Sequence, residues 1–246
     1  MRFKSRYTSI AASLGLLLLL VLTTAALNNV LSTDDLWSLY DKSVVDSAVY
    51  RHDSLRQLYP LKFDAPTMTT TVVTLTGYDY PLGQQALSRD VWVTAVPEVQ
   101  QKCQKFTDPD LQMRLRELLG LQPTATFTYF VTMTVRADDV FRPAPNPVTV
   151  TQSLCDRPES DSTCGELFPN WVGNEHKAWI ANKALTSYLV SADHNGAYSY
   201  PWTRLGYTYD WKPGADKYGA SEYVIRPGSI VTVTSKTPYA QYCAAK

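Results

Sequence analysis

The sequence has no excess of either charge, because its 23 lysine and arginine residues balance its 23 aspartate and glutamate residues. It also has no run of like charge long enough to form an acidic or basic tail. Phosphate binding normally needs a basic surface, so we do not expect a nucleic acid partner. The length of 246 residues and the 45% hydrophobic content are typical of one compact domain, with or without a targeting segment.

Common catalytic and metal-binding motifs are missing as well. The sequence contains no C-x-x-C pair, no H-E-x-x-H, no G-x-S-x-G and no glycine-rich phosphate loop. No two of its three histidines have the spacing of metal ligands. We therefore expect neither a bound metal nor a cofactor.

Charged residues are absent from residues 8–27, which read TSIAASLGLLLLLVLTTAAL. Arg2, Lys4 and Arg6 precede this run. A basic flank followed by an apolar run is typical of a secretory signal peptide or of a single transmembrane anchor. The dense apolar core over residues 14–22 has the length of a signal peptide, whereas the whole run is long enough to span a bilayer.

Both interpretations place the rest of the chain outside the cytoplasm, because the positive end of the segment stays inside. The small residues Thr24 and Ala26 permit cleavage after Ala26. The sequence thus predicts a signal peptide or signal anchor over residues 1–27 and an extracytoplasmic domain over residues 28–246. The protein is then periplasmic, on the cell surface or secreted, and it contacts a membrane only through the N-terminal segment, if that segment is not cleaved.

The four cysteines agree with an exported protein, because disulfides persist in oxidising compartments. Three pairings are possible. Cys155 and Cys164 bracket the short polar stretch DRPESDST, which would gain little order from burial and would be held by a local bridge. That pairing leaves Cys103 with Cys243, a bridge that ties the C-terminal tail to the body of the domain.

Residue periodicity predicts a mixture of strands and helices. Strands neighbour strands, and the helices between them follow no regular βαβ rhythm. We therefore expect an α+β fold in a single exported domain, with a mixed or antiparallel sheet and about three helices. The predicted helices are residues 31–59, 108–121 and 174–189, and the predicted strands include residues 67–77, 89–96, 126–136, 221–225 and 230–235.

The stretch YSYPWTRLGYTYDW, residues 198–211, is unusually rich in aromatic side chains. Two alternating trios flank the loop TRLG, which predicts a β-hairpin. In the register with Trp202 opposite Tyr207, all six rings share one face. Such a face either packs against the core of the domain or binds a ligand such as a sugar, a flat heterocycle or an extended peptide. The candidate ligand-binding residues are Tyr198, Tyr200, Trp202, Tyr207, Tyr209, Asp210 and Trp211.

Candidate catalytic side chains lie close to this stretch in the sequence. Asp193 and His194 occupy a glycine-bearing loop after a predicted helix, Arg204 lies in the hairpin loop, and Glu222 lies near the start of a predicted strand. An acid, a base and a cation beside a groove can support hydrolysis. The candidate catalytic residues are therefore His194, Arg204 and Glu222.

The segment GASEYVIRPGSIVTV, residues 219–233, resembles the last part of ADP-ribosyltransferase and NAD-glycohydrolase domains. In those domains a glutamate or glutamine leads a strand, and a proline-containing turn and a second strand follow. The resemblance implies that Glu222 holds the nicotinamide ribose and that a strand arginine such as Arg136 contacts phosphate. The chain departs from the pattern at Ala220, where many such transferases carry a second acid, and it lacks their Ser-Thr-Ser strand motif.

These observations predict an extracytoplasmic, disulfide-linked domain that binds a small molecule, a glycan or a peptide through its aromatic stretch. The alternative is a secreted hydrolase or transferase similar to ADP-ribosyltransferases or NAD-glycohydrolases, and a third interpretation is an envelope protein that only packs against partners. A binding domain shows affinity without turnover, whereas the enzyme depends on Glu222.

Overall fold

The computed structural model describes residues 31–155, 163–190 and 199–244. The chain divides into two compact units, residues 1–36 and residues 37–246. In the described part of the first unit, a helix starts beside Ser32. The Ser32 hydroxyl accepts a hydrogen bond from the Asp35 N–H (3.1 Å), and the Ser32 N–H donates to Asp35 Oδ2 (3.1 Å), a reciprocal capping pair. Within the three described ranges, no helix is both long and apolar enough to cross a membrane.

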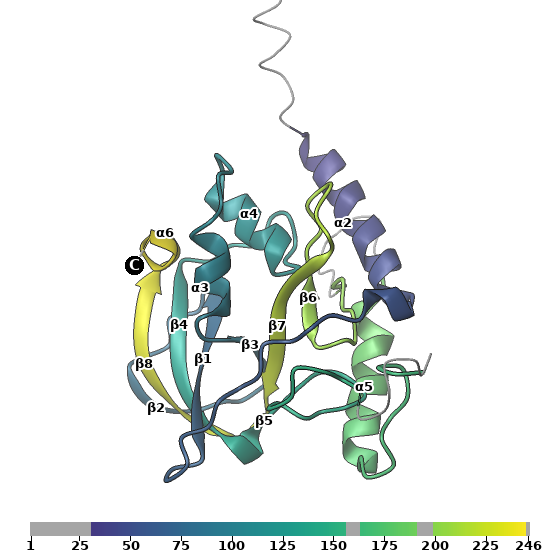
Figure 1. Ribbon diagram of the computed structural model, residues 1–246. Coiled ribbons are helices and arrows are strands. Elements are labelled where there is room, and N and C mark those ends of the chain that lie inside the picture. The colour runs from purple at the N-terminus through teal and green to yellow at the C-terminus, as the bar shows by residue number, and fades with distance from the viewer. Residues whose placement is uncertain (1–30, 156–162, 191–198, 245–246) are drawn as a thin grey trace, which may run out of the picture. The chain divides into compact units, whose positions relative to one another are not determined.

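The second unit is built on one antiparallel sheet of eight strands (Figure 1). The strand order is β2-β8-β4-β1-β3-β7-β5, and β6 pairs with β7 beside that path. Helices accompany this sheet, so the predicted α+β fold is confirmed. The strands are β1 (Thr69–Thr76), β2 (Gly83–Ala86), β3 (Val91–Ala95), β4 (Tyr129–Arg136), β5 (Val140–Phe141), β6 (Tyr207–Tyr209), β7 (Tyr218–Ile225) and β8 (Ile230–Pro238).

The helices differ from the predicted ranges mainly at their ends. The helix predicted over residues 31–59 ends at Ala48, and the helix predicted over residues 108–121 begins at Leu111. Asp110 caps the second of these by accepting a hydrogen bond from a backbone N–H of the first turn (2.9 Å). The helices are α2 (Thr33–Ala48), α3 (Glu98–Cys103), α4 (Leu111–Leu118), α5 (Asn174–Ser187) and α6 (Tyr239–Ala244), with two short 3-10 turns at His52–Ser54 and Ala137–Asp139.

Apolar side chains pack on both faces of the sheet. Neighbouring residues of a strand point to opposite faces, so Val72 and Val73 of β1 belong to different cores. Val72 packs in a cluster with Met133 on one face. Val73 packs with Phe130 and Leu115 on the other face, which α3, α4 and α6 cover (Figure 1). The second face also carries the site described below.

The sheet is strongly curved. β7 and β8 are consecutive in the sequence, but β3, β1 and β4 lie between them in the sheet. At about 4.8 Å per strand, a flat sheet would place β7 and β8 roughly 19 Å apart. The connecting residues Arg226 to Ser229 form a turn in which the Ser229 N–H donates to the Arg226 C=O (3.4 Å), so they are not extended enough to cover that distance. Curvature therefore brings the end of β7 close to the start of β8.

Both predicted disulfides are present. Cys103 at the end of α3 pairs with Cys243 in α6 across a sequence separation of 140 residues. Cys155 pairs with Cys164 across a separation of 9 residues. Disulfides persist in oxidising compartments, so the two bridges are consistent with an extracytoplasmic protein.

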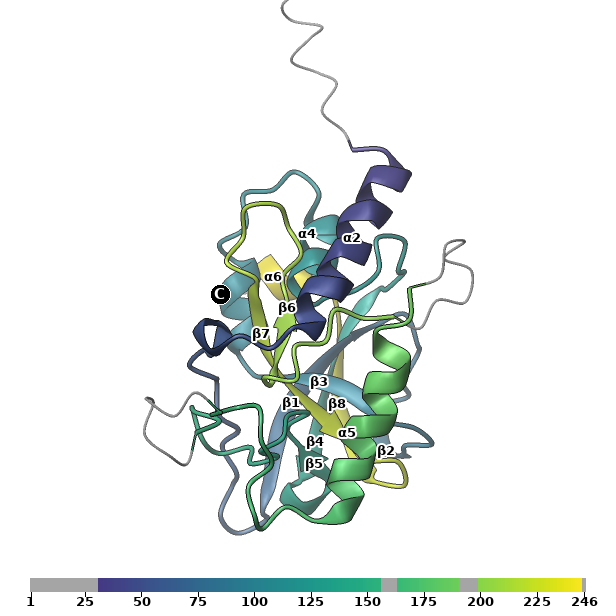
Figure 2. The ribbon, with the colours of Figure 1, turned by 90° about the vertical axis from the view of Figure 1, so that its right-hand side faces the viewer.

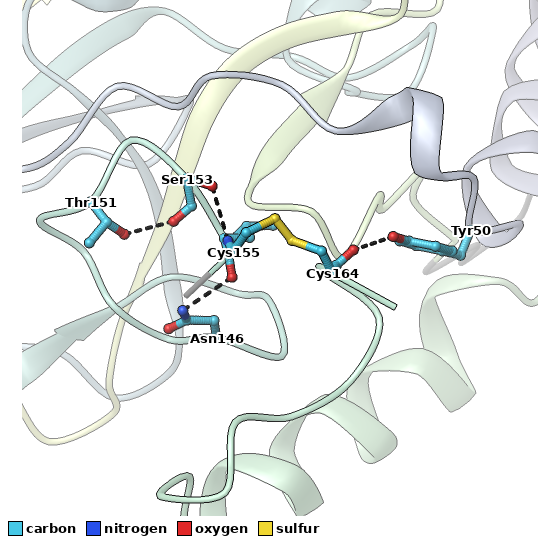
Figure 3. The surroundings of a disulfide bond; sticks show 7 residues. Tyr50, Asn146, Thr151, Ser153, Cys155 and Cys164 are labelled. Atoms are coloured by element: carbon cyan, nitrogen blue, oxygen red, sulfur yellow. Dashed lines mark hydrogen bonds between the residues drawn. A yellow bond between two sulfur atoms is a disulfide. The ribbon is translucent and has the colours of Figure 1, made fainter. Parts of the chain in front are cut away.

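Hydrogen bonds hold the local bridge from both sides (Figure 3). The Cys155 N–H donates to Ser153 Oγ (3.0 Å), and Thr151 Oγ1 donates to the Ser153 C=O (2.9 Å). On the other side, the Tyr50 hydroxyl donates to the Cys164 C=O. The bridge therefore ties the chain around Ser153 to the segment that contains Tyr50.

Candidate functional site

The two halves of the aromatic stretch do not pair in the predicted register. Trp202 forms an isolated bridge with Thr208 instead of lying opposite Tyr207. Tyr207 lies opposite Ser221, because β6 pairs with β7. A shift of one residue in register moves side chains to the other face, so Trp202 and Tyr207 do not share a face. The predicted single face of six rings is wrong.

The loop between Trp202 and Tyr207 explains this shift. The Thr203 hydroxyl donates to the Tyr207 C=O (2.7 Å), so the backbone at Tyr207 is held by the loop itself. Gly206 has a φ of 76°, and a Cβ at this position would lie 2.6 Å from Cδ of the fully buried Arg142. The path of the loop therefore depends on close contact with the buried Arg142, which lies far away in the sequence.

The five described rings of the stretch lie in three different environments. Tyr200 is 45% exposed, whereas the other four rings are buried. Tyr200, Trp202 and Tyr209 line one cavity. Tyr207 packs in a separate apolar cluster. Trp211 borders a second, smaller hollow of about 390 Å³, which Tyr209 and Asp210 also line. The binding surface predicted from the sequence is thus divided, and only part of it faces a common space.

This common space, called the aromatic cavity below, has a volume of about 540 Å³, which is typical of small-molecule sites. Its sheet wall contains Val73, Thr94 and Glu222, which lie directly opposite one another on β1, β3 and β7. Directly opposed residues share a face of a sheet, so this row lies on one side. The aromatic side chains that line the cavity are Trp92, Phe130, Tyr200, Trp202 and Tyr209.

α5 and the segment before β6 form another wall, and hydrogen bonds join the two. The Tyr200 N–H donates to the Ser187 C=O (2.7 Å), and the Tyr188 hydroxyl donates to the Trp202 C=O (2.6 Å). These bonds connect the last turn of α5 to the backbone on both sides of Pro201, which also lines the cavity. The exposed Tyr200 ring is thereby held beside the opening.

Three tryptophans from different elements meet beside this wall, and two of them, Trp92 and Trp202, line the cavity. Trp92 comes from β3, Trp179 from α5 and Trp202 from the aromatic stretch, and their ring centroids are 6.0 to 6.2 Å apart. α5 accordingly packs alongside β3 (Figure 2). Trp179 Nε1 donates to Asp90 Oδ2 (3.0 Å), whereas the buried Trp202 Nε1 has no hydrogen-bond partner within the described residues. Trp202 thus lines the cavity with its ring, while its Nε1 donor is buried.

Glu222 supplies the one carboxyl group among the described lining residues. It lies in the middle of β7 rather than near the start of a strand, and it is only 5% exposed. Its Oε1 is buried without a hydrogen-bond partner in the described part of the chain. Burial raises the pKa of Glu222 to about 8, because the charged form loses hydration there. At neutral pH the carboxyl group is mostly protonated and uncharged.

Two cationic side chains, Arg89 and Lys183, also line the cavity. Arg89 is exposed and forms no ion pair with any other described residue. Lys183 is half-buried, and its Nζ lies 3.5 Å from Asp90 Oδ2. Among the described residues, two positive groups and the single negative group of Asp90 therefore lie on this side of the cavity.

The structure brings together only part of the predicted catalytic set. Glu222 lines the aromatic cavity, but Arg204 does not. Arg204 Nη2 instead donates to the Ala48 C=O (2.6 Å). His194 lies outside the described residues, as does Tyr198 of the predicted binding set.

Two further charged candidates make contacts away from the cavity. Asp210 is buried and forms a bidentate pair with Arg114 of α4, with N–O distances of 3.1 and 2.5 Å. Arg136, at the end of β4, is exposed, and its Nη2 lies 3.9 Å from Asp138 Oδ2. Neither Asp210 nor Arg136 is a lining residue of the aromatic cavity.

Sequence reasoning missed Trp92, Lys183 and Arg89 as site residues. Trp179 and Lys183 are four residues apart on a predicted helix, so they share one helix face, and this spacing was the available signal. Lys183 Nζ indeed lies 5.5 Å from the Trp179 ring centroid and 6.0 Å from that of Trp92. No local pattern pairs this helix with the strand that carries Trp92.

No group of three or more histidine, cysteine, aspartate or glutamate side chains is placed to hold a metal ion in the part of the chain that the structure describes. In comparisons with known proteins, no family model, no curated protein and no solved structure matches this chain.

Trp211 has the surroundings of a core residue, which leads to a stability prediction. It is 4% exposed, its Nε1 donates to the Leu121 C=O (3.0 Å), and its ring lies edge-on to Tyr40 at 5.8 Å. We expect Trp211→Ala to lower the free energy of unfolding by about 3–5 kcal/mol, the usual cost of deleting a large buried ring. Thermal melting should show a fall on the order of 10 °C. Tyr200→Ala, at an exposed position, is the comparison, and equal losses in the two variants would contradict the assignment.

Proposed function

We propose that residues 28–246 form an extracytoplasmic domain whose aromatic cavity binds a small molecule. The basic flank and apolar run of residues 1–27 support export of the chain, and the two disulfides are consistent with it. The ligand contacts a subset of the predicted aromatic residues, namely Tyr200, Trp202 and Tyr209, together with Trp92.

One observation carries this proposal: the aromatic cavity is lined mostly by apolar side chains and contains the carboxyl group of Glu222, which forms no hydrogen bond or ion pair with any other described residue. Leaving a buried polar group unpaired costs free energy, and a polar atom of a ligand that contacts the carboxyl group of Glu222 would offset part of that cost. A mostly apolar cavity with a few convergent polar groups is the usual form of a small-molecule site.

A second candidate function rests on Glu222 itself. A buried carboxyl group with a pKa of about 8 remains protonated at neutral pH and can act as a general acid. This supports a secreted hydrolase or transferase, the class to which the resemblance of residues 219–233 also points. The enzyme differs from a binding domain in showing turnover, which Glu222→Gln would abolish while leaving the fold intact.

A neutral fluorescent dye, N-phenylnaphthylamine, tests the binding function, because its emission rises in an apolar site. The oxidised protein is expected to bind the dye saturably. Tyr200→Ala should weaken that binding by about fivefold to tenfold, since the contact of one aromatic wall is worth roughly 1 kcal/mol. Fluorescence titration gives both dissociation constants.

Tyr78→Ala is the matched control for the dye titration. Tyr78 is 59% exposed, as Tyr200 is 45% exposed, but it does not line the aromatic cavity. We expect Tyr78→Ala to bind the dye as the unchanged protein does. Dye binding that is absent, or that both substitutions weaken equally, would rule out the cavity as the binding site.

A further inference from the structure

The charges around the aromatic cavity are separated by position, and this separation bears on the class of ligand. Glu222 is buried against the sheet, whereas Arg89 is exposed and Lys183 is half-buried on α5. All three side chains line the same cavity. The interior therefore contains the acidic group, and the opening contains the basic ones.

The interior does not offer a site for a cation. Glu222 lies in a row with Thr94 and Val73 on the sheet, and no described basic side chain is bonded to its carboxyl group. Burial keeps this carboxyl group protonated at neutral pH, so it presents an uncharged acid to the cavity. A neutral, polar part of a ligand is compatible with this environment.

The opening favours an anion. Arg89 has no ion-pair partner among the described residues, and its guanidinium group can form two parallel hydrogen bonds with a carboxylate or phosphate. Lys183 lines the same cavity, and its Nζ lies 3.5 Å from Asp90 Oδ2. The single charge of Asp90 offsets only one of the two positive charges. An anionic group of the ligand at this position would neutralise the remaining positive charge.

The tryptophans define the space between these two regions. The rings of Trp92 and Trp202 are nearly perpendicular, at 87°, with centroids 6.2 Å apart. Lys183 Nζ lies 6.0 Å from the Trp92 centroid, so a ring that contacts Trp92 also comes within reach of the ammonium group. Flat rings stack on tryptophan faces and make edge-to-face contacts with tryptophan rings.

We propose that the ligand of the aromatic cavity is a planar molecule with an anionic group, whose ring contacts Trp92 and Trp202 and whose anion pairs with Arg89 and Lys183. A neutral polar atom of the ligand bonds to the uncharged carboxyl group of Glu222. This inference rests on the proposed binding function and adds the chemical class of the ligand. Aromatic carboxylates and phosphorylated heterocycles share this chemistry.

Three probes with the same ring and different charges test the inference. Naphthylacetate is anionic, naphthylacetamide is its neutral counterpart, and naphthylethylamine is cationic. Calorimetric or ligand-observed NMR titration of the full oxidised protein should show that naphthylacetate binds about threefold to tenfold more tightly than the other two. Added salt should reduce this preference, because the opening is exposed to solvent.

A double variant locates the preference on the two cations. Arg89→Gln with Lys183→Gln should bind all three probes with similar affinity and should bind naphthylacetamide as before. Arg136→Gln with Lys105→Gln is the control, because it removes the same charge from exposed positions that do not line the cavity. This control should retain the preference for naphthylacetate.

The outcomes separate this inference from the binding function itself. If the amide or the amine binds as tightly as naphthylacetate, or if the preference survives in the Arg89/Lys183 variant, the anionic class is wrong. If no naphthyl probe binds but N-phenylnaphthylamine does, the cavity remains a binding site and the anionic class is again wrong. If the dye does not bind either, the binding function fails as well.

Discussion

Replacing Cys103 and Cys243 with serine is expected to lower the free energy of unfolding by about 5 kcal/mol. The bridge closes a loop of 140 residues, and in the chain-entropy account a longer loop restricts the unfolded chain more. Both sulfur atoms are also buried in the core shared by α3, α4 and α6. Thermal melting should fall by roughly 10–20 °C, and hydrogen exchange should increase most in β8 and α6.

The local bridge provides the matched comparison. Replacing Cys155 and Cys164 with serine removes a bridge that closes a loop of only 9 residues. We expect this change to lower the free energy of unfolding by about 3 kcal/mol. The order of the two losses is the critical result. A variant without the local bridge that melts as low as the variant without the long-range bridge would contradict the argument.

We expect the free energy of unfolding of the Glu222→Gln variant, measured relative to the unchanged protein, to be markedly higher at pH 8 than at pH 4. The folded state holds the Glu222 proton up to a pKa of about 8, whereas the unfolded chain releases it near the ordinary value of 4.5. Between these values the folded state binds more protons, so rising pH favours unfolding. The unchanged protein thus loses on the order of 4–5 kcal/mol over this window, and glutamine removes that loss.

Denaturant titrations of both proteins between pH 4 and pH 9 measure this effect. Other titrating groups are present in both proteins, so their contributions cancel in the difference. Glu117→Gln is a useful second variant, because burial raises the pKa of Glu117 to about 7 and the same sign should appear over a narrower window. Parallel stability profiles for Glu222→Gln and the unchanged protein would mean that Glu222 is ionised in the folded state.

Long elements with strong local signals were predictable. β1, β3, β4, β7 and β8 all fall on predicted strands, because β-branched and alternating residues favour extended structure wherever they occur. The short elements α3, α6, β2 and β5 were missed. They have six residues or fewer, and α6, for example, is held by its disulfide and by the stacking of Tyr242 on Phe130 at 4.1 Å. Such contacts come from distant parts of the chain.

The candidate site was predictable only in part for the same reason. Tyr200, Trp202, Tyr209 and Glu222 were identified from composition and position, and they do line one cavity. Their arrangement was predicted wrongly, because the register of the aromatic stretch depends on the buried Arg142 below Gly206. The cations at the opening are Lys183 on α5 and Arg89, which lies shortly before β3. Local patterns connect neither residue to the aromatic stretch.

The sequence by itself determined the α+β class, the pairing of the four cysteines and the positions of the main strands. These features follow from local propensity and from the spacing and character of residues along the chain. Only the tertiary structure decided which aromatic rings share a space, that Glu222 is buried beside them, and that Arg89 and Lys183 stand at the opening. The curvature of the sheet and the packing of α5 on β3 decide these positions, and both arise from contacts between segments that are far apart in the sequence.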